Sequence, residues 1–352
     1  MMARIREFRL PSGVVLETPL MIPSLSSRGF DFQENGLSET ALYLQAVQEY
    51  LTESLLVSAY DLHHQMMPQA REFLSDLHWD TIWATPTLLV VDSGGYELGN
   101  VWDGAEVRRG ERPSREFRKE DYRQLVGMLP RDRDLLVVTW DHVAQEGDRL
   151  SLGQQISEAG QFCTENPDFM VDFLLKPEQG ERFINADKVK ECCSDMARFD
   201  VIGVTEKELG ESILDRALNL LRLRRTLDDA QVDRPIHIFG ALDPLFIRLY
   251  FMCGAEIFDG LTWLRYGIFQ GVTVYKEAAA LLCGDFDRDE SGRLTRQQIG
   301  YLRELRALKR DLKEIVEVQR GAPDFGLTER SVIDVLNEIN VGLQERGAGN
   351  GW

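Results

Sequence analysis

The stretch that decides the fold is Leu88-Leu89-Val90-Val91-Asp92-Ser93-Gly94-Gly95-Tyr96-Glu97. Its apolar, β-branched first half is typical of a strand buried on both faces. The strand ends in a carboxylate, and the two glycines after it allow close approaches that a Cβ would forbid. Because α/β folds place their chemistry at this end of a parallel strand, Asp92 is a candidate active-site acid. The alternative is that Asp92 caps the turn, as Asp often does.

The same kind of strand recurs along the chain. Apolar strands alternate with amphipathic helices about eight times, and most crossovers are long enough for parallel neighbours. No Gly-x-Gly-x-x-Gly follows the first strand, so a closed (β/α)8 TIM barrel is favoured over a doubly wound sheet. A hairpin is expected over 4–20, and the strands are expected at 18–23, 54–60, 88–92, 134–141, 169–177, 200–204, 235–240 and 255–259. Helices are expected at 38–51, with Leu42, Leu44, Val47 and Leu51 on its apolar side, and at 119–129, 148–166, 186–196, 211–227 and 244–253.

The pattern changes after Asp259 to one that predicts mostly helix. Helices are expected over 272–282, 295–318 and 329–344, with leucines at helical spacing. The domains expected are therefore a barrel catalytic domain over 1–270, a helical region over 271–345 and a disordered tail over 346–352.

Composition limits the class of protein. The 352 residues suit one large domain with additions or two domains, and 43% hydrophobic with 28% charged residues is typical of soluble globular proteins. A net charge of −18 argues against a protein that coats nucleic acid non-specifically, although a local basic groove stays possible. The five cysteines lack disulfide or zinc spacing, and no leader or membrane-spanning run is evident, so a cytoplasmic protein is expected.

Three of the expected strands end in an acid: Asp92, Asp141 and Asp259. In a parallel barrel these ends open on one face, so the three carboxylates should meet at one mouth. Acids that lie close together repel, which raises at least one pKa and can create a nucleophile beside a proton donor. That arrangement suits glycosyl chemistry, in which one carboxylate attacks the anomeric carbon and another moves the proton.

These residues resemble the tRNA-guanine transglycosylases, the queuine- and archaeosine-type enzymes together with related 7-deazaguanine DNA-modification enzymes. The stretch Asp92–Tyr96 is similar to that family's catalytic Asp-Ser-Gly-Gly-aromatic motif. The stretch Ile257–Arg265 resembles the segment that carries the family's nucleophile and a closing arginine, which match Asp259 and Arg265. Shorter similarities at 18–23, 55–62, 138–141 and 238–240 follow in the family's order, so the resemblance runs from about residue 11 to 265.

The resemblance implies a role for each matching residue. Asp259 would attack C1′ and expel guanine, and Asp92 would shuttle the proton. Tyr96 and Phe239 would sandwich the base, and Asp141 would read its Watson–Crick edge. The remaining residues of the implied substrate site are Ser93, Gly94, Gly240 and Arg265. Tyr96 and Phe239 could instead be core aromatics and Asp141 a helix cap. Phosphate contacts are expected from arginines near the expected mouth of the barrel, namely Arg108, Arg109, Arg112 and Arg265.

Three departures from the family narrow what the resemblance implies. Lys176-Pro177-Glu178-Gln179-Gly180 stands where the family has Gln-Gly-Gly, and Gly203–Glu211 replaces its Gly-Leu-Ala-Val-Gly-Glu loop. The Cys-x-Cys-x-x-Cys and distant His of its structural zinc are absent. Base recognition has therefore changed, no zinc is expected, and tRNA and DNA both stay open as the substrate, together with a purine or 7-deazapurine base.

A second candidate site is the stretch Asp287–Thr295, which resembles the start of an EF-hand calcium loop. Its oxygen ligands would be Asp287, Asp289 and Ser291, but Gln298 replaces the bidentate Glu at the twelfth position. Calcium binding is therefore expected to be weak at best. A polar turn that caps a helix from Thr295 is the preferred interpretation, and no metal or other cofactor is expected.

Three functions are consistent with the sequence. The first is a transglycosylase, a pentosyltransferase that replaces guanine in tRNA or DNA with a 7-deazaguanine-type base through a glycosyl-aspartate. The second is a catalytically weak relative that serves as a partner or specificity subunit, as a homodimer or with another protein. The third is a nucleoside or glycoside hydrolase that uses the same acids with water.

Overall fold

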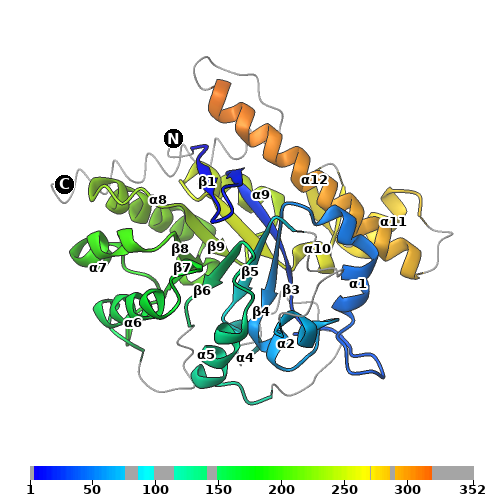
Figure 1. The fold of residues 1–352 in the computed structure, drawn as a ribbon. Helices are drawn as coiled ribbons and strands as arrows, with labels where there is room; N and C mark the ends of the chain where they lie inside the picture. The colour runs from blue at the N-terminus through cyan, green and yellow to red at the C-terminus, as the bar shows by residue number, and fades with distance from the viewer. Residues whose placement is uncertain are drawn as a thin grey trace.

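A computed structural model describes residues 4–75, 86–98, 115–140, 149–269, 271–285 and 290–318. Its described residues form a closed barrel of eight parallel strands in the order β10-β3-β4-β5-β6-β7-β8-β9 (Figure 1). The expected TIM barrel is thereby confirmed. The barrel strands are β3 (Leu20–Leu25), β4 (Ser54–Ser58), β5 (Leu88–Asp92), β6 (Leu135–Val138), β7 (Met170–Leu175), β8 (Val201–Thr205), β9 (Ile236–Phe239) and β10 (Ile257–Gly260).

Helices surround the barrel and follow its strands. They are α1 (Thr40–Val47), α2 (Ala59–His63), α3 (Ala70–Phe73), α4 (Gly95–Leu98), α5 (Lys119–Met128), α6 (Leu152–Glu165), α7 (Ala186–Cys192), α8 (Ile213–Asp229), α9 (Pro244–Met252), α10 (Thr262–Arg265), α11 (Lys276–Leu282) and α12 (Glu290–Val318). Side chains fix where several of them begin. Ser151 and Ser212 form reciprocal caps with Gln154 and Asp215, and the Asp243 carboxylate caps α9.

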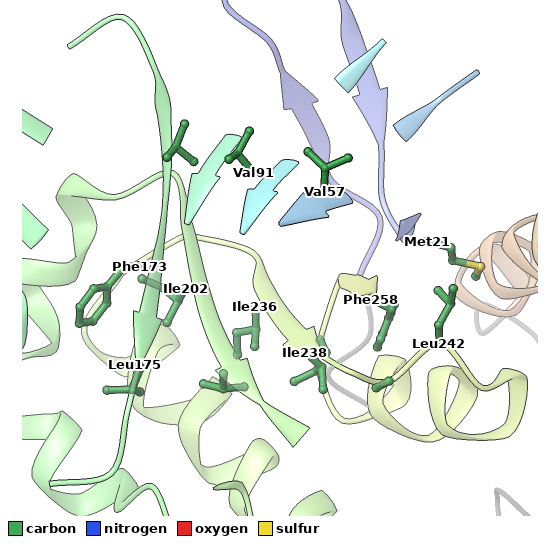
Figure 2. Packing of buried hydrophobic residues seen from close by; sticks show 14 of the residues in the cluster. Met21, Val57, Val91, Phe173, Leu175, Ile202, Ile236, Ile238, Leu242 and Phe258 are labelled. Atoms are coloured by element: carbon green, nitrogen blue, oxygen red, sulfur yellow. The ribbon is translucent and has the colours of Figure 1, made fainter. Parts of the chain in front are cut away.

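Alternate side chains of each strand point outward and pack beneath the helices. Figure 2 shows part of this layer, including Val57, Val91, Phe173, Ile202 and Ile238, all buried. Burying one such side chain stabilises the fold by about 1.5–3 kcal/mol. The apolar runs on both faces of the strands therefore account for the closed barrel between helices.

The opposite side chains fill the interior, and the amino-terminal half of the barrel is apolar. Leu20, Leu88 and Ile257 form a buried cluster there with Phe8 and Leu16 of the hairpin β1 (Glu7–Arg9) and β2 (Val15–Glu17). The hairpin lies at the end of the barrel away from α2 and α4 (Figure 1). It closes that end, so polar interior residues gather toward the other one.

Four expectations about local structure are wrong. Val272–Val274 forms strand β12, paired with β11 (Gly267–Phe269), because its β-branched residues suit a hairpin; the helix expected from residue 272 begins at Lys276. Strand β4 ends at Ser58, where α2 begins, and β6 ends at Val138, so Asp141 does not end that strand as expected. Leu42 is 49% exposed, because it lies off the buried face of α1.

The fourth difference lies at Asp287–Thr295, where a polar turn that caps a helix from Thr295 is expected. Helix α12 begins at Glu290, so it occupies the second half of the stretch that would have formed the calcium loop. It also begins five residues before Thr295, and the expected cap at that residue is therefore wrong. Asp287, Asp289 and the expected helix at 329–344 lie outside the described residues. Among the described helices, each is too short or too polar to cross a bilayer.

Candidate functional site

Asp259 lies at the carboxyl end of β10, inside the barrel, with 6% of its surface exposed. The hydroxyl of Ser24 on β3 donates a hydrogen bond of 2.7 Å to Oδ2. The backbone N–H of Gly240, just after β9, donates one of 2.9 Å to Oδ1. Each carboxylate oxygen is thus held from a neighbouring strand, and hydrogen bonds to a charged acceptor of this kind are strong. The side chain is therefore fixed at the carboxyl end of the barrel strands.

Beneath Asp259 lies a second buried pair, Asp172 on β7 and His237 on β9. Nδ1 of His237 is 2.6 Å from Oδ2 of Asp172, and Nε2 is 3.4 Å from Oδ1 of Asp259. Both side chains of the pair are fully buried. Burial alone would lower the pKa of His237, but the carboxylates of Asp172 and Asp259 outweigh it and raise this pKa to about 9. Burial raises the pKa of Asp172, and His237 opposes that rise.

Asp92 is the last residue of β5 and is partly exposed. It alternates with Leu88 and Val90, which line the interior, so its side chain starts on the inner face as well. The N–H of Gly94 donates a hydrogen bond of 3.2 Å to its Oδ2. Gly94 has a φ of +89°, and a Cβ there would lie 2.9 Å from Cβ of Tyr60. The turn after Asp92 therefore requires glycine for both its backbone shape and its packing.

A third carboxylate lies on the rim between the two predicted acids. Glu97 on α4 accepts hydrogen bonds from the hydroxyls of Ser26, just after β3, and Ser58, at the end of β4. Ser58 is directly beside Asp92 in the strand register. Burial raises the pKa of Glu97. Glu97 thus bridges the ends of β3 and β4, the two strands that lie between β10 with Asp259 and β5 with Asp92.

The two predicted base-stacking rings also lie at this end of the barrel. The guanidinium of Arg28 lies 4.6 Å from the ring centroid of Tyr96, and Nη2 of Arg265 donates a hydrogen bond of 2.8 Å to the Tyr96 hydroxyl. The ring of Phe239 lies against that of His237, with centroids 3.9 Å apart. Both aromatic residues are partly exposed, so neither is a fully buried core residue. A stacked base stays a prediction for both.

Lys176 stands at the end of β7, near where the resemblance expects Gln-Gly-Gly. Its Nζ lies 2.8 Å from Oε2 of Glu208 and 3.5 Å from Oγ1 of Thr205. A charged pair therefore stands at this place on the rim, and a changed mode of base recognition there stays a prediction.

The remaining predicted residues divide into two groups. Ser93 is buried, and within the described residues its hydroxyl has no hydrogen-bond partner. Asp141 and the arginines at 108, 109 and 112 lie outside the described residues. In the part of the chain that is described, no group of three or more His, Cys, Asp or Glu is arranged to hold a metal ion.

Sequence reasoning missed four contributors to the site: Ser24, Glu97, Asp172 and His237. Asp172 and His237 carried a signal, because each interrupts an apolar strand with a residue type that is rarely buried without a partner. Their pairing depends on the order and register of β7, β9 and β10, which a single sequence does not display.

A scan against protein-family models found no match for this chain, and a search of curated proteins found none either. The fold and the site define a TIM barrel with an acid-rich interior at the carboxyl ends of its strands.

Proposed function

We propose that the chain is a base-exchange glycosyltransferase that replaces guanine in a nucleic acid, tRNA or DNA, with a 7-deazaguanine-type base. The observation that carries the proposal is the fixed carboxylate of Asp259. Ser24 and Gly240 hold its two oxygens, and His237 approaches it from below. A second carboxylate, Asp92, ends a strand of the same barrel.

The proposed reaction has two displacement steps on C1′ of the nucleotide. In the first, an oxygen of Asp259 forms a bond to C1′ while the bond from C1′ to the guanine nitrogen breaks. The base leaves with that electron pair and takes a proton from the protonated form of Asp92. In the second, the Asp92 carboxylate accepts a proton from the incoming base, whose nitrogen bonds to C1′ as the ester bond to Asp259 breaks. Two inversions retain the configuration at C1′.

The geometry of Asp259 favours the role of nucleophile over that of acid. Its hydrogen-bond partners are donors, and donors stabilise a carboxylate in its charged form. An ionised carboxylate attacks, and a protonated one does not. Asp92 is more exposed, which suits a group that exchanges its proton with two different bases.

Two arginine side chains lie among the carboxylates of the mouth. Arg28 and Arg265 both contact Tyr96 at the rim. Guanidinium groups recognise phosphate oxygens and also stack on bases. In the proposed complex a single nucleotide is extruded into the mouth of the barrel. Few positively charged side chains bind the phosphates of the rest of the polymer.

The test is the exchange of radiolabelled guanine into tRNA and into duplex DNA. Wild-type protein is expected to label one of the two polymers, and Asp259→Asn and Asp92→Asn to label neither. The matched control is Glu256→Gln, which alters a buried carboxylate at the opposite end of the barrel, paired with Arg6 and Arg224.

Each other outcome supports a different function. Cleavage of nucleosides without exchange would favour a hydrolase that uses the same acids with water. Tight binding of a polymer or partner without any turnover would favour a specificity subunit. Label in neither polymer from folded wild-type protein contradicts the proposed exchange activity.

A further inference from the structure

The Asp172–His237 pair lies in the barrel directly below Asp259, and the proposed reaction does not use it. Both side chains are fully buried, so neither can contact solvent. Burying two ionisable groups costs several kcal/mol unless they are paired. Asp172 and His237 offset this cost by pairing with each other, and the pair places Nε2 of His237 3.4 Å from Oδ1 of Asp259.

Hydrogen-bond geometry fixes where the protons lie. An oxygen of Asp172 is 2.6 Å from Nδ1, so one proton is shared between these two atoms. If Nε2 carried no proton, its lone pair would face the Asp259 carboxylate at 3.4 Å, and the two would repel. Nε2 therefore carries a proton directed at Asp259, and with the shared proton on Nδ1 the ring is an imidazolium paired with the Asp172 carboxylate. Within the described residues Nε2 has no hydrogen-bond partner of ordinary length, and it lies 3.4 Å from Oδ1 of Asp259.

Space around the pair is limited, which keeps the imidazole in place. A Cβ on Gly203 would lie 2.5 Å from Oδ1 of Asp172 and 2.5 Å from Cε2 of Phe239. The glycine thus leaves room for the carboxylate on one side and for the Phe239 ring that covers the imidazole. The ring of His237 cannot turn away without displacing these neighbours.

We propose that His237, oriented by Asp172, is a positioning residue that holds the Asp259 carboxylate with Nε2–H and balances its negative charge during attack on C1′. The role rests on the proposed function, since it needs Asp259 as the nucleophile. A shift of about 1 Å in a reacting group can reduce the rate about 100-fold. Loss of the imidazole removes both the orientation and the charge, and substrate binding at the rim is unchanged.

The protonation state of His237 tests the proposal without any turnover. Nitrogen NMR of protein with labelled histidine follows all five imidazoles, and the signal lost in His237→Gln identifies the one of interest. Both of its nitrogens are expected to carry protons at pH 7.5, with a midpoint near 9. The midpoint should fall by about one pH unit or more in Asp259→Asn, and further in Asp172→Asn. A neutral ring at pH 7.5, or a midpoint that Asp259→Asn leaves unchanged, overturns the proposal.

Kinetics supply the second readout. His237→Gln keeps an amide donor without a charge, so its kcat should fall about 100-fold while KM changes less than about threefold. Glu256→Gln should leave kcat unchanged. Normal kcat in folded His237→Gln overturns the positioning role and leaves the exchange activity standing. If wild type does not exchange bases at all, the proposed function fails, and the NMR titration still decides whether His237 bears the charge that faces Asp259.

Discussion

The stability of the protein should fall between pH 6.5 and 8.5 because of His237. In the folded state its pKa is about 9, against 6.5 for an unperturbed histidine, because burial is outweighed by the carboxylates of Asp172 and Asp259. A group whose pKa is raised by folding stabilises the fold fully below its unfolded pKa. That contribution is then lost as the pH rises through the folded pKa. The window is therefore set by these two values.

The magnitude follows from the linkage between protons and folding. One unit of pKa shift corresponds to about 1.4 kcal/mol, so His237 contributes about 3 kcal/mol at pH 6 and loses about 2 kcal/mol of it by pH 8.5. The imidazole is fully buried, so solvent does not screen the contribution. This is a large part of the stability of a typical domain.

The pH range in which the contribution of His237 to stability changes differs from that of other groups with shifted pKa values. Burial and the neighbouring His63 and Arg115 lower the pKa of His64 to about 4, so His64 affects stability only below pH 6.5. Burial raises the pKa values of Cys163 and Cys192 to about 11, so these thiols affect stability only as the pH approaches 9. Groups that titrate inside the window in both proteins cancel when wild type is compared with a variant.

The assay is urea unfolding of wild type and His237→Gln at half-unit steps between pH 6 and 8.5. The difference in the free energy of unfolding between the two proteins should shrink by about 2 kcal/mol across this range. Parallel curves, with a difference constant to within about 0.5 kcal/mol, would show that folding does not raise the pKa of His237. The charge proposed beneath Asp259 would then be contradicted.

Three further predictions follow from individual contacts. Ser24→Ala removes a buried hydrogen-bond donor from Asp259, so the first-order rate of base exchange should fall about 10-fold or more. Single-turnover kinetics measure this rate, and Ser24→Thr, which keeps the hydroxyl, is the control. Glu256→Ala removes a buried carboxylate that accepts from Arg6 and from the Ile236 N–H, while Asp233 and Asp228 still pair with Arg6 and Arg224. Urea unfolding should therefore show a loss of about 1–3 kcal/mol, with an unchanged exchange rate per folded molecule. Gly203→Ala places a methyl group against Asp172, so thermal unfolding should show a loss of about 1–3 kcal/mol. The NMR titration midpoint of His237 should change as well. An unchanged midpoint would mean that the Asp172–His237 pair tolerates the displacement.

Much of the barrel could be predicted from the sequence, because its signals are local. Runs such as Leu88–Asp92 and Met170–Leu175 are apolar on both faces, and helical stretches separate them. The hairpin over Glu7–Glu17 was evident from its alternation and its Pro-Ser-Gly turn. The three-residue strand Val272–Val274 was missed because so short a run leaves periodicity undecided, and its tertiary partner β11 decides it.

The site was predictable only in part, since its parts come from different strands. Asp92 and Asp259 could be singled out because each lies at the carboxyl end of a buried strand with a glycine within two residues. Ser24 was missed because its contact with Asp259 depends on the closure of the barrel between β10 and β3. His237 was missed because a polar residue within an apolar strand does not reveal its partner. Register and closure are tertiary properties, and no local pattern carries them.

The central claim is that Asp259 forms a covalent bond with a nucleotide. It is tested most directly by mixing the protein with tRNA or duplex DNA, quenching in acid, digesting, and measuring the mass of the peptide that contains residue 259. A peptide that carries a nucleotide-derived adduct on Asp259, present in wild type and absent in Asp259→Asn, is the predicted result. An unmodified peptide under conditions in which the base is released would contradict the claim, since release would then proceed without a glycosyl-aspartate.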